Sequence, residues 1–233
     1  MVRPARWAPP RQGAQSASPS PTFGGVPTES RRLLLVRHGQ STWNADGRWQ
    51  GQADPPLSSL GEEQAQDAAA RLGEFGFSRV LASDLQRATR TAEILAGSLG
   101  LPVEVDADLR EIDVGDWTGM TRAEIEARWP GELAAWSEGR SESTMGGESR
   151  AHLTARARSI LLRVAGAGAP GDRILVVSHG ALIRNLDRVL GLAPQGIPNL
   201  AGRWYSSDGD GSLTPGGLVS LADPEDRTLS PSP

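Results

Sequence analysis

The sequence contains neither cysteine nor lysine, and each absence excludes a class of chemistry. Without cysteine the chain cannot form disulfides or bind a metal ion through thiolates. Without lysine it cannot form a Schiff base, and it lacks the lysine of a nucleotide-binding phosphate loop. All 24 basic residues are therefore arginines, whose planar guanidinium groups stay charged and can bind a phosphate through two parallel hydrogen bonds.

Long apolar segments are also missing. No run of eighteen apolar residues is present, so the sequence predicts no transmembrane helix. The first thirty residues hold arginine, proline and serine but no apolar core of a secretion signal, and we expect a cytoplasmic protein. A formal net charge of −4 disfavours nucleic acid and anionic membranes as partners. We predict a disordered arm at residues 1–30, one domain at 31–222 and a disordered tail at 223–233.

Short apolar runs alternate with helical patterns along the predicted domain. Two of the runs are unbroken, as in strands that are buried on both faces of a parallel sheet. Serine or threonine followed three residues later by Glu or Gln predicts several helix starts. The expected extended segments are Leu33–Val36, Arg79–Ala82, Val103–Val105, Leu109–Val114, Ile174–Val177 and an edge hairpin around Asp208–Gly211; the expected helices are Gln64–Leu72, Leu85–Leu99, a segment from Thr121 to Pro130, Ser149–Val164 and Leu182–Leu190. This alternation predicts an α/β fold with three layers, α/β/α, around a mostly parallel central sheet.

Two of the three histidines stand directly after the unbroken apolar runs. His38 lies in an Arg-His-Gly triplet after Leu33–Val36, and His179 lies in a Ser-His-Gly triplet after Ile174–Val177. Ligands of α/β proteins bind at the carboxyl ends of the strands. If the two strands are neighbours, both imidazoles face one crevice. The third histidine, His152, falls within a predicted helix, and we interpret it as a surface residue.

Two arginines accompany these histidines. Arg37 precedes His38, and Arg87 falls in the first turn of the helix that follows another strand. Cations gathered at a buried position without carboxylates are costly unless an anion binds there. The N–H groups at nearby helix starts add further positive potential. The pattern therefore predicts a phosphate site.

The segment LVRHGQSTWN, residues 35–44, resembles the signature of the histidine phosphatase superfamily, which includes the cofactor-dependent phosphoglycerate mutases. The resemblance covers most of the chain outside the arm and the tail. It continues through Leu57–Ala65, Ser83–Ala92, Leu109–Gly119, Gly146–Ser149 and Val177–Gly180, in the order that the family shows. It implies a phosphoglycerate mutase-like fold and a catalytic domain over residues 31–222.

The same resemblance implies a role for each candidate residue. His38 resembles the histidine that accepts the phosphoryl group and Glu111 the proton donor. The residues that surround the phosphate in the family are resembled by Arg37, Asn44, Arg87 and His179. We assign His38, Glu111 and His179 to catalysis. We assign Arg37, Asn44 and Arg87 to substrate binding. Guanidinium groups nearby would keep His38 neutral. The pKa of Glu111 should be raised, by burial or by a carboxylate such as that of Asp113.

Other activities stay open as alternatives. No HExxH-type spacing predicts a metal site, and we expect neither a metal ion nor a cofactor. A phosphoglycerate mutase would keep the phosphohistidine, but Asp113 and Asp116 follow the acid here and would disfavour a second anionic group nearby. A binding protein that has lost turnover would not need all of the site residues. Hydrolysis of a small-molecule phosphate ester is therefore preferred.

The sequence leaves the substrate and the oligomeric state open. Sugar phosphates, phosphoglycerate derivatives and α-ribazole phosphate are all candidates. Trp43, Trp49 and Trp117 are candidate walls of the substrate site, although a tryptophan more often belongs to the core. A homodimer is compatible with the sequence but is not predicted by any motif.

Overall fold

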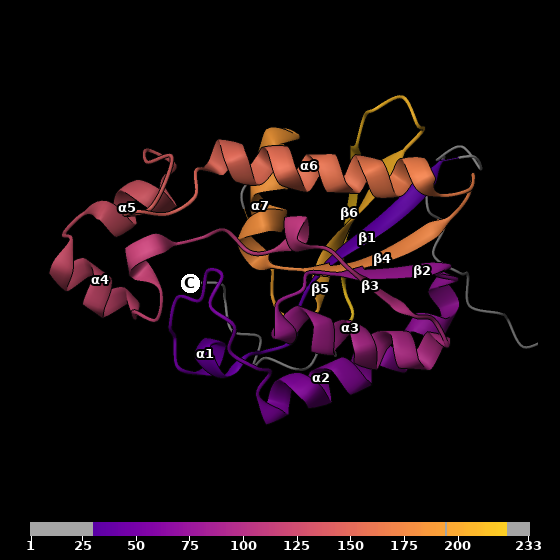
Figure 1. Ribbon diagram of the computed structural model, residues 1–233, viewed down its shortest axis with the longest axis horizontal. Coiled ribbons are helices and arrows are strands. Elements are labelled where there is room, and N and C mark those ends of the chain that lie inside the picture. The colour runs from indigo at the N-terminus through magenta and orange to yellow at the C-terminus, as the bar shows by residue number, and fades with distance from the viewer. Residues whose placement is uncertain (1–29, 194, 223–233) are drawn as a thin grey trace, which may run out of the picture.

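The computed structural model describes residues 30–193 and 195–222 (Figure 1). The tail predicted at 223–233 and the arm predicted at 1–30 lie outside the described residues, except for Ser30. This serine is buried and its hydroxyl donates a hydrogen bond to Asp208.

One six-stranded sheet forms the centre of the described chain. The strands are β1 (Arg31–Arg37), β2 (Arg79–Ala82), β3 (Val103–Val105), β4 (Arg173–Ser178), β5 (Ala201–Ser207) and β6 (Thr214–Ser220). Their order across the sheet is β3-β2-β4-β1-β5-β6. β1, β2, β3 and β4 run parallel, whereas β5 and β6 are antiparallel additions beyond β1. The prediction of a mostly parallel sheet is confirmed.

Helices cover both faces of this sheet, which gives the three predicted layers (Figure 1). Helices α6 (Arg150–Ala167) and α7 (Gly180–Val189) lie on one face, and α2 (Ser59–Ala69) and α3 (Gln86–Leu99) lie on the other. The short helices α1 (Thr42–Ala45), α4 (Arg122–Arg128) and α5 (Glu132–Ser137) lie together beyond one end of the sheet. This end holds the carboxyl ends of β1 and β4.

The unbroken apolar runs are explained by burial on both faces. Leu33 and Leu35 of β1 belong to the core beneath α6 and α7, whereas Leu34 and Val36 belong to the core beneath α2 and α3. All four side chains have no solvent-exposed area. Because successive side chains of a strand point to opposite faces, only a continuous apolar run can fill both cores.

Several predicted boundaries differ from the structure. Helix α2 begins five residues before the predicted start, where Ser58 caps it, and ends three residues before the predicted end. Residues 109–114 form no strand; a 3-10 turn at Ala107–Leu109 precedes an irregular segment. The predicted hairpin is present but longer, and its first strand, β5, pairs with β1 inside the sheet.

A close backbone approach fixes the loop after β1. A Cβ placed on Gly61 of α2 would lie 1.9 Å from the carbonyl oxygen of Gln40, and one placed on Gly39 would lie 2.6 Å from the carbonyl oxygen of Gly61. Real side chains cannot occupy these positions without displacing the backbone. The two glycines therefore let α2 pack directly against the loop that follows His38.

Candidate active site

His38 and His179 lie side by side at the carboxyl ends of two neighbouring strands. β1 pairs with β4 in a register that places Arg37 opposite Ser178, so the next residue on each strand is a histidine. The two imidazole centroids are 5.1 Å apart, and the ring planes are inclined by 62°. The pairing of β1 with β4 therefore brings the two histidines together, as the sequence predicted.

The hydrogen bonds of His38 determine which nitrogen is free to react. Its Nδ1 lies 2.6 Å from the carbonyl oxygen of Gly39, and because a carbonyl only accepts, Nδ1 carries the proton. The lone pair is then on Nε2, which accepts a 3.3 Å hydrogen bond from Nε of Arg87. The side chain of Asn199 holds the backbone carbonyl of His38 at 2.7 Å. The ring is thus fixed with Nε2 toward the arginines.

Burial lowers the pKa of His38 well below its usual value of about 6.5, and the charges of Arg87 and Arg37 lower it further. The hydrogen bond to Gly39 acts in the opposite direction but is outweighed. His38 is consequently neutral near pH 7, as a nucleophile must be.

Backbone carbonyl oxygens hold the two predicted arginines of the site. Arg87 is fully buried and donates to the carbonyl oxygens of Ala53 at 2.7 Å and Gly51 at 2.9 Å. Arg37 donates to the carbonyl oxygen of Ile197 at 2.9 Å. Carbonyl oxygens orient a guanidinium group without neutralising its charge. Arg87 therefore keeps its positive charge for an anion.

Burial also changes the pKa values of the two arginines. It lowers the pKa of Arg37 to about 9, with a contribution from the neighbouring charge of Arg184, and that of Arg87 to about 10. His179 is fully buried, and neither of its ring nitrogens has a hydrogen-bond partner among the described residues. Unpaired buried polar groups are costly, so these groups are arranged for a ligand that accepts hydrogen bonds.

Asn44 reaches the site from the short helix α1. Its backbone N–H and side-chain oxygen both bond with Ser41, which forms a capping box at the start of this helix. The hydroxyl of Ser41 also donates to Gln50 at 2.8 Å. The loop between β1 and α2 is thus tied together by buried side chains, and both Asn44 and Gln50 line the cavity in front of His38.

Glu111 also lines this cavity, and its side chain reaches the start of α7. Its carboxylate accepts hydrogen bonds from the backbone N–H groups of Ala181 at 3.1 Å and Leu182 at 3.2 Å. A further bond of 3.0 Å comes from the N–H of Ile112. The carboxyl group is therefore held close to His179, the residue that precedes α7. The expected upward shift in the pKa of Glu111 stays a prediction.

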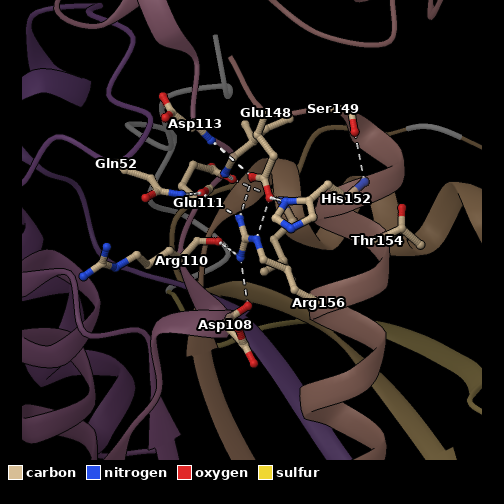
Figure 2. Close-up of polar contacts among 12 residues, drawn as sticks. Gln52, Asp108, Arg110, Glu111, Asp113, Glu148, Ser149, His152, Thr154 and Arg156 are labelled. Carbon is tan, nitrogen blue, oxygen red and sulfur yellow. Dashed lines mark hydrogen bonds and ion pairs between the residues drawn. The ribbon is translucent and has the colours of Figure 1, made fainter. Parts of the chain in front are cut away.

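An arginine of α6 holds the segment that carries Glu111 (Figure 2). The guanidinium group of Arg156 donates to the carbonyl oxygens of Asp108, Arg110 and Glu111 at 2.8, 2.7 and 2.9 Å. The same group pairs with the largely buried carboxylate of Glu148 through two contacts of 2.8 Å. Burial raises the pKa of Glu148, but the hydrogen bonds and charge of Arg156 outweigh it and lower the pKa below its usual value. The sequence predicted a strand here, but the hydrogen bonds of Arg156 hold this segment instead of pairing with a neighbouring strand.

The cavity in front of His38, called the inner cavity from here on, is lined by five of the six predicted site residues. Arg37, His38, Asn44, Arg87 and Glu111 line it, while His179 is buried beside His38. Sequence reasoning missed Gln50 and Arg184 in this lining. Arg184 could have been found, because it lies one helical turn after Gly180 on the same face of α7. No residue spacing indicated Arg156 or Gln50.

The structure removes one argument that was based on the sequence. Asp113 and Asp116 are exposed and line neither the inner cavity nor the one beside it. The carboxylate of Asp113 instead accepts from the N–H of Gly115, two residues ahead in its own turn. The expectation that these carboxylates disfavour a second anionic group at the site is therefore wrong.

The three candidate tryptophans have different positions. Trp49 lines the inner cavity and packs edge-on against Trp117, with ring centroids 5.2 Å apart. Trp117 is 1% exposed and belongs to the core, and Trp43 lines neither of the two cavities. In the described part of the chain, no group of three metal-ligating side chains is gathered, and no helix is both long and apolar enough to span a membrane.

Comparison with known proteins places this geometry in a family. The chain matches the histidine phosphatase superfamily (branch 1) over residues 33–207. It is 42% identical to a glucosyl-3-phosphoglycerate phosphatase of Mycobacterium tuberculosis strain H37Rv, over 69% of this chain and 75% of the relative. It is 40% identical to the Mycolicibacterium vanbaalenii protein of the same name, over 76% and 82% of the two chains.

Solved structures agree with the sequence relatives. A mycobacterial glucosyl-3-phosphoglycerate phosphatase, solved in complex with VO3, superposes with a TM-score of 0.73 at 36% identity and covers 82% of this chain and 99% of that one. A putative α-ribazole-5'-P phosphatase of Escherichia coli K-12 gives a TM-score of 0.68 at 28% identity, over 82% and 97% of the chains. The family resemblance drawn from the motifs is confirmed: the chain belongs to the histidine phosphatase superfamily.

Proposed function

We propose that this chain is a phosphomonoesterase that hydrolyses a small phosphorylated metabolite through a phosphohistidine on His38. The observation that carries the proposal is the meeting of a neutral imidazole lone pair with guanidinium groups in one buried cavity. Such groups stabilise the charge on phosphoryl oxygens, while the lone pair supplies the nucleophile.

In the first step, Nε2 of His38 attacks phosphorus as the bond between phosphorus and the ester oxygen breaks. Arg37, Arg87 and His179 bind the three non-bridging oxygens. Glu111 gives a proton to the departing oxygen, which leaves as an alcohol. In the second step, water attacks the phosphohistidine. Glu111 takes the proton of that water, His38 is released, and inorganic phosphate leaves the site.

The relatives support hydrolysis over transfer. The two relatives at 40% and 42% identity are named phosphatases, although a probable phosphoglycerate mutase of Escherichia fergusonii is 38% identical over 69% of this chain. Glucosyl-3-phosphoglycerate is accordingly the first substrate to test. A mutase would instead return the phosphoryl group of His38 to the same carbon skeleton. Release of inorganic phosphate distinguishes hydrolysis from this transfer.

We further propose that the reaction needs no metal ion and that the protein acts in the cytoplasm. Turnover of p-nitrophenyl phosphate should survive dialysis against EDTA, and loss of activity that added Mg²⁺ or Zn²⁺ restores would contradict this part. Cell fractionation with an antibody against the chain tests the location.

Trapping the intermediate tests the central claim. The wild-type protein, mixed with radiolabelled p-nitrophenyl phosphate and quenched in alkaline detergent, should carry a base-stable label. His38→Ala should carry none and should release no phosphate, whereas His152→Ala, which removes the exposed histidine of α6, should keep the label. A label that persists in His38→Ala would overturn the proposal.

A further inference from the structure

The loop at residues 38–41 carries the nucleophile but belongs to none of the helices and strands of the described chain. Its backbone is held by side chains instead of by a helix or a sheet ladder. A peptide group is planar, so a hydrogen bond to its N–H also fixes the direction of its C=O. The orientation of His38 therefore depends on the side chains that bond to the first two peptide groups of this loop.

The first of these peptide groups joins His38 to Gly39. Its carbonyl oxygen accepts a hydrogen bond of 2.7 Å from Nδ2 of Asn199, and its N–H donates one of 3.1 Å to the hydroxyl oxygen of Thr91. Asn199 and Thr91 have no solvent-exposed area. Because the N–H and C=O of a trans peptide point in opposite directions, the two side chains hold the backbone of His38 from both sides.

The hydroxyl of Thr91 can serve this loop only as an acceptor. Thr91 lies in α3, one turn after Arg87, and its hydroxyl donates a hydrogen bond of 2.7 Å to the carbonyl oxygen of Arg87. A hydroxyl has a single proton, so the same oxygen must accept from the N–H of Gly39. Thr91 therefore connects the backbone of the nucleophile with the turn of α3 that carries Arg87.

The second peptide group joins Gly39 to Gln40 and determines the tautomer of His38. Its carbonyl oxygen is the acceptor 2.6 Å from Nδ1 of His38, and its N–H donates a hydrogen bond of 3.1 Å to Oε1 of Gln64. Gln64 of α2 is buried, and its Nε2 has no partner among the described residues. An unpaired buried donor is costly, so Gln64 contributes through its oxygen alone. This oxygen keeps the carbonyl of Gly39 directed at Nδ1.

We propose that Thr91 and Gln64 are positioning residues for the nucleophile, because they hold the two peptide groups that keep Nδ1 of His38 protonated and Nε2 unprotonated. Neither side chain lines the inner cavity, so both act through His38. Without these bonds the carbonyl of Gly39 turns away from Nδ1, and the proton can move to Nε2, where it blocks attack. The inference rests on the proposed phosphatase activity and adds two residues to its mechanism.

Single-turnover kinetics of Thr91→Val test the inference. Valine has nearly the shape of threonine but no hydroxyl. The rate at which radiolabelled p-nitrophenyl phosphate labels His38, followed by rapid alkaline quench, should fall about ten-fold because the nucleophile is misplaced. The inhibition constant of inorganic phosphate should change by less than about two-fold, because the groups that bind phosphate remain. Thr91→Ser keeps the hydroxyl and should label at a rate close to that of the wild-type protein.

Thr89→Val is the matched control. Thr89 lies on the same helix, and its hydroxyl donates to the carbonyl oxygen of Ser83 at 2.9 Å, outside the loop that follows His38. Both valine variants lose a hydrogen bond from a threonine hydroxyl to a backbone carbonyl, so both should lose stability in urea denaturation. Only Thr91→Val should also lose labelling rate, which separates positioning from stability.

Imidazole ¹⁵N chemical shifts give a second readout that requires no turnover. Near pH 7 the wild-type protein should show His38 with a protonated Nδ1 and an unprotonated Nε2, and His38→Ala assigns the two signals. Gln64→Met keeps an unbranched side chain without the amide oxygen, and it should move the ring toward the other tautomer. This variant also tests the inference if Thr91→Val does not fold. An unchanged tautomer in folded Gln64→Met would refute it.

The inference and the proposed function fail in different ways. If the wild-type protein hydrolyses p-nitrophenyl phosphate while Thr91→Val and Thr89→Val are labelled equally fast, the positioning role is refuted and the phosphatase activity stands. If the wild-type protein neither hydrolyses an ester nor carries a label, the proposed function fails. The imidazole spectra then still decide whether Gln64 determines the tautomer of His38.

Discussion

Nε of Arg87 lies 3.3 Å from Nε2 of His38, so the arginine donates a hydrogen bond to the nitrogen that would attack phosphorus. The same guanidinium group is held by the carbonyl oxygens of Gly51 and Ala53. Arg87 therefore orients His38 and is placed to bind a phosphoryl oxygen of a substrate. The proposed function thus gives Arg87 two roles, which are to orient His38 and to bind the phosphoryl group.

Arg87→Lys should lower kcat/KM for p-nitrophenyl phosphate by about 10- to 100-fold. The planar guanidinium group donates separate hydrogen bonds to His38, to two carbonyl oxygens and to a phosphate, and an ammonium group cannot reproduce this geometry. Each charged hydrogen bond that is lost costs about 1.5–3 kcal/mol. Steady-state kinetics measures the effect. Arg90→Lys, on an exposed turn of the same helix, is the matched control and should be unaffected. Wild-type kinetics in Arg87→Lys would contradict its role.

Glu111→Gln should slow the hydrolysis of alkyl phosphates far more than that of p-nitrophenyl phosphate. An alkoxide needs a proton in order to leave, whereas nitrophenolate leaves without one. General acid catalysis of this kind contributes about 100- to 10,000-fold, which is the expected range for glycerol 3-phosphate. Rates on the two substrates are compared in the same variant. If both fall by an equal factor, Glu111 is not the proton donor.

Arg156→Gln should act through Glu111, because Arg156 touches the backbone of that residue and not the cavity. We expect a loss of about ten-fold on glycerol 3-phosphate and a smaller one on p-nitrophenyl phosphate, as for a displaced acid. The double variant with Glu111→Gln should lose little more than Glu111→Gln alone, since two substitutions in one network are not additive. Independent, multiplying losses would show that Arg156 does not act through Glu111.

The buried histidines should make stability depend on pH. The pKa values of His38 and His179 lie well below their usual value, chiefly through burial and then through Arg87. Below about pH 6.5 the unfolded chain gains protons at both residues while the folded chain does not, so the free energy of unfolding falls as the pH falls. The slope is at most about 1.4 kcal/mol per pH unit for each histidine.

Urea denaturation between about pH 7.5 and 5.5 measures this slope, above the range in which carboxylates titrate. Above pH 6.5 the two histidines contribute no dependence. His179→Gln should reduce the slope by up to half. A free energy of unfolding that stays constant across this window would show that both imidazoles are protonated in the folded protein.

Gly61→Ala should destabilise the protein by about 1–3 kcal/mol, because its Cβ would lie 1.9 Å from the carbonyl oxygen of Gln40. The displaced loop carries His38, so activity should fall as well. Gly97→Ala is the matched control: it lies within α3, nothing lies within 4 Å of its added Cβ, and alanine should raise stability by about 0.5–1 kcal/mol. Chemical denaturation compares both, and similar stability of the two variants would refute the packing argument.

Local sequence patterns were sufficient for the elements that carry the site. The unbroken run before His38 predicted a doubly buried strand because both faces of that strand meet an apolar core. The capping box of Thr121 and Glu124 predicted the start of α4, and Pro130 predicted its end, since these signals act within one turn of the chain. The segment that carries Glu111 was mispredicted as extended, because hydrogen bonds from Arg156, 45 residues away, replace the ladder of a strand.

The sequence alone determined which side chains could carry chemistry: two histidines after apolar runs, arginine as the sole cation besides histidine, and no thiol. These follow from residue types and from neighbours along the chain. Only the tertiary structure decided which charges meet, because Arg184 reaches the cavity in front of His38 from α7 while Asp113 and Asp116 remain outside it. Electrostatic energy depends on distance in space, and the packing of α4, α6 and α7 around the sheet end sets those distances.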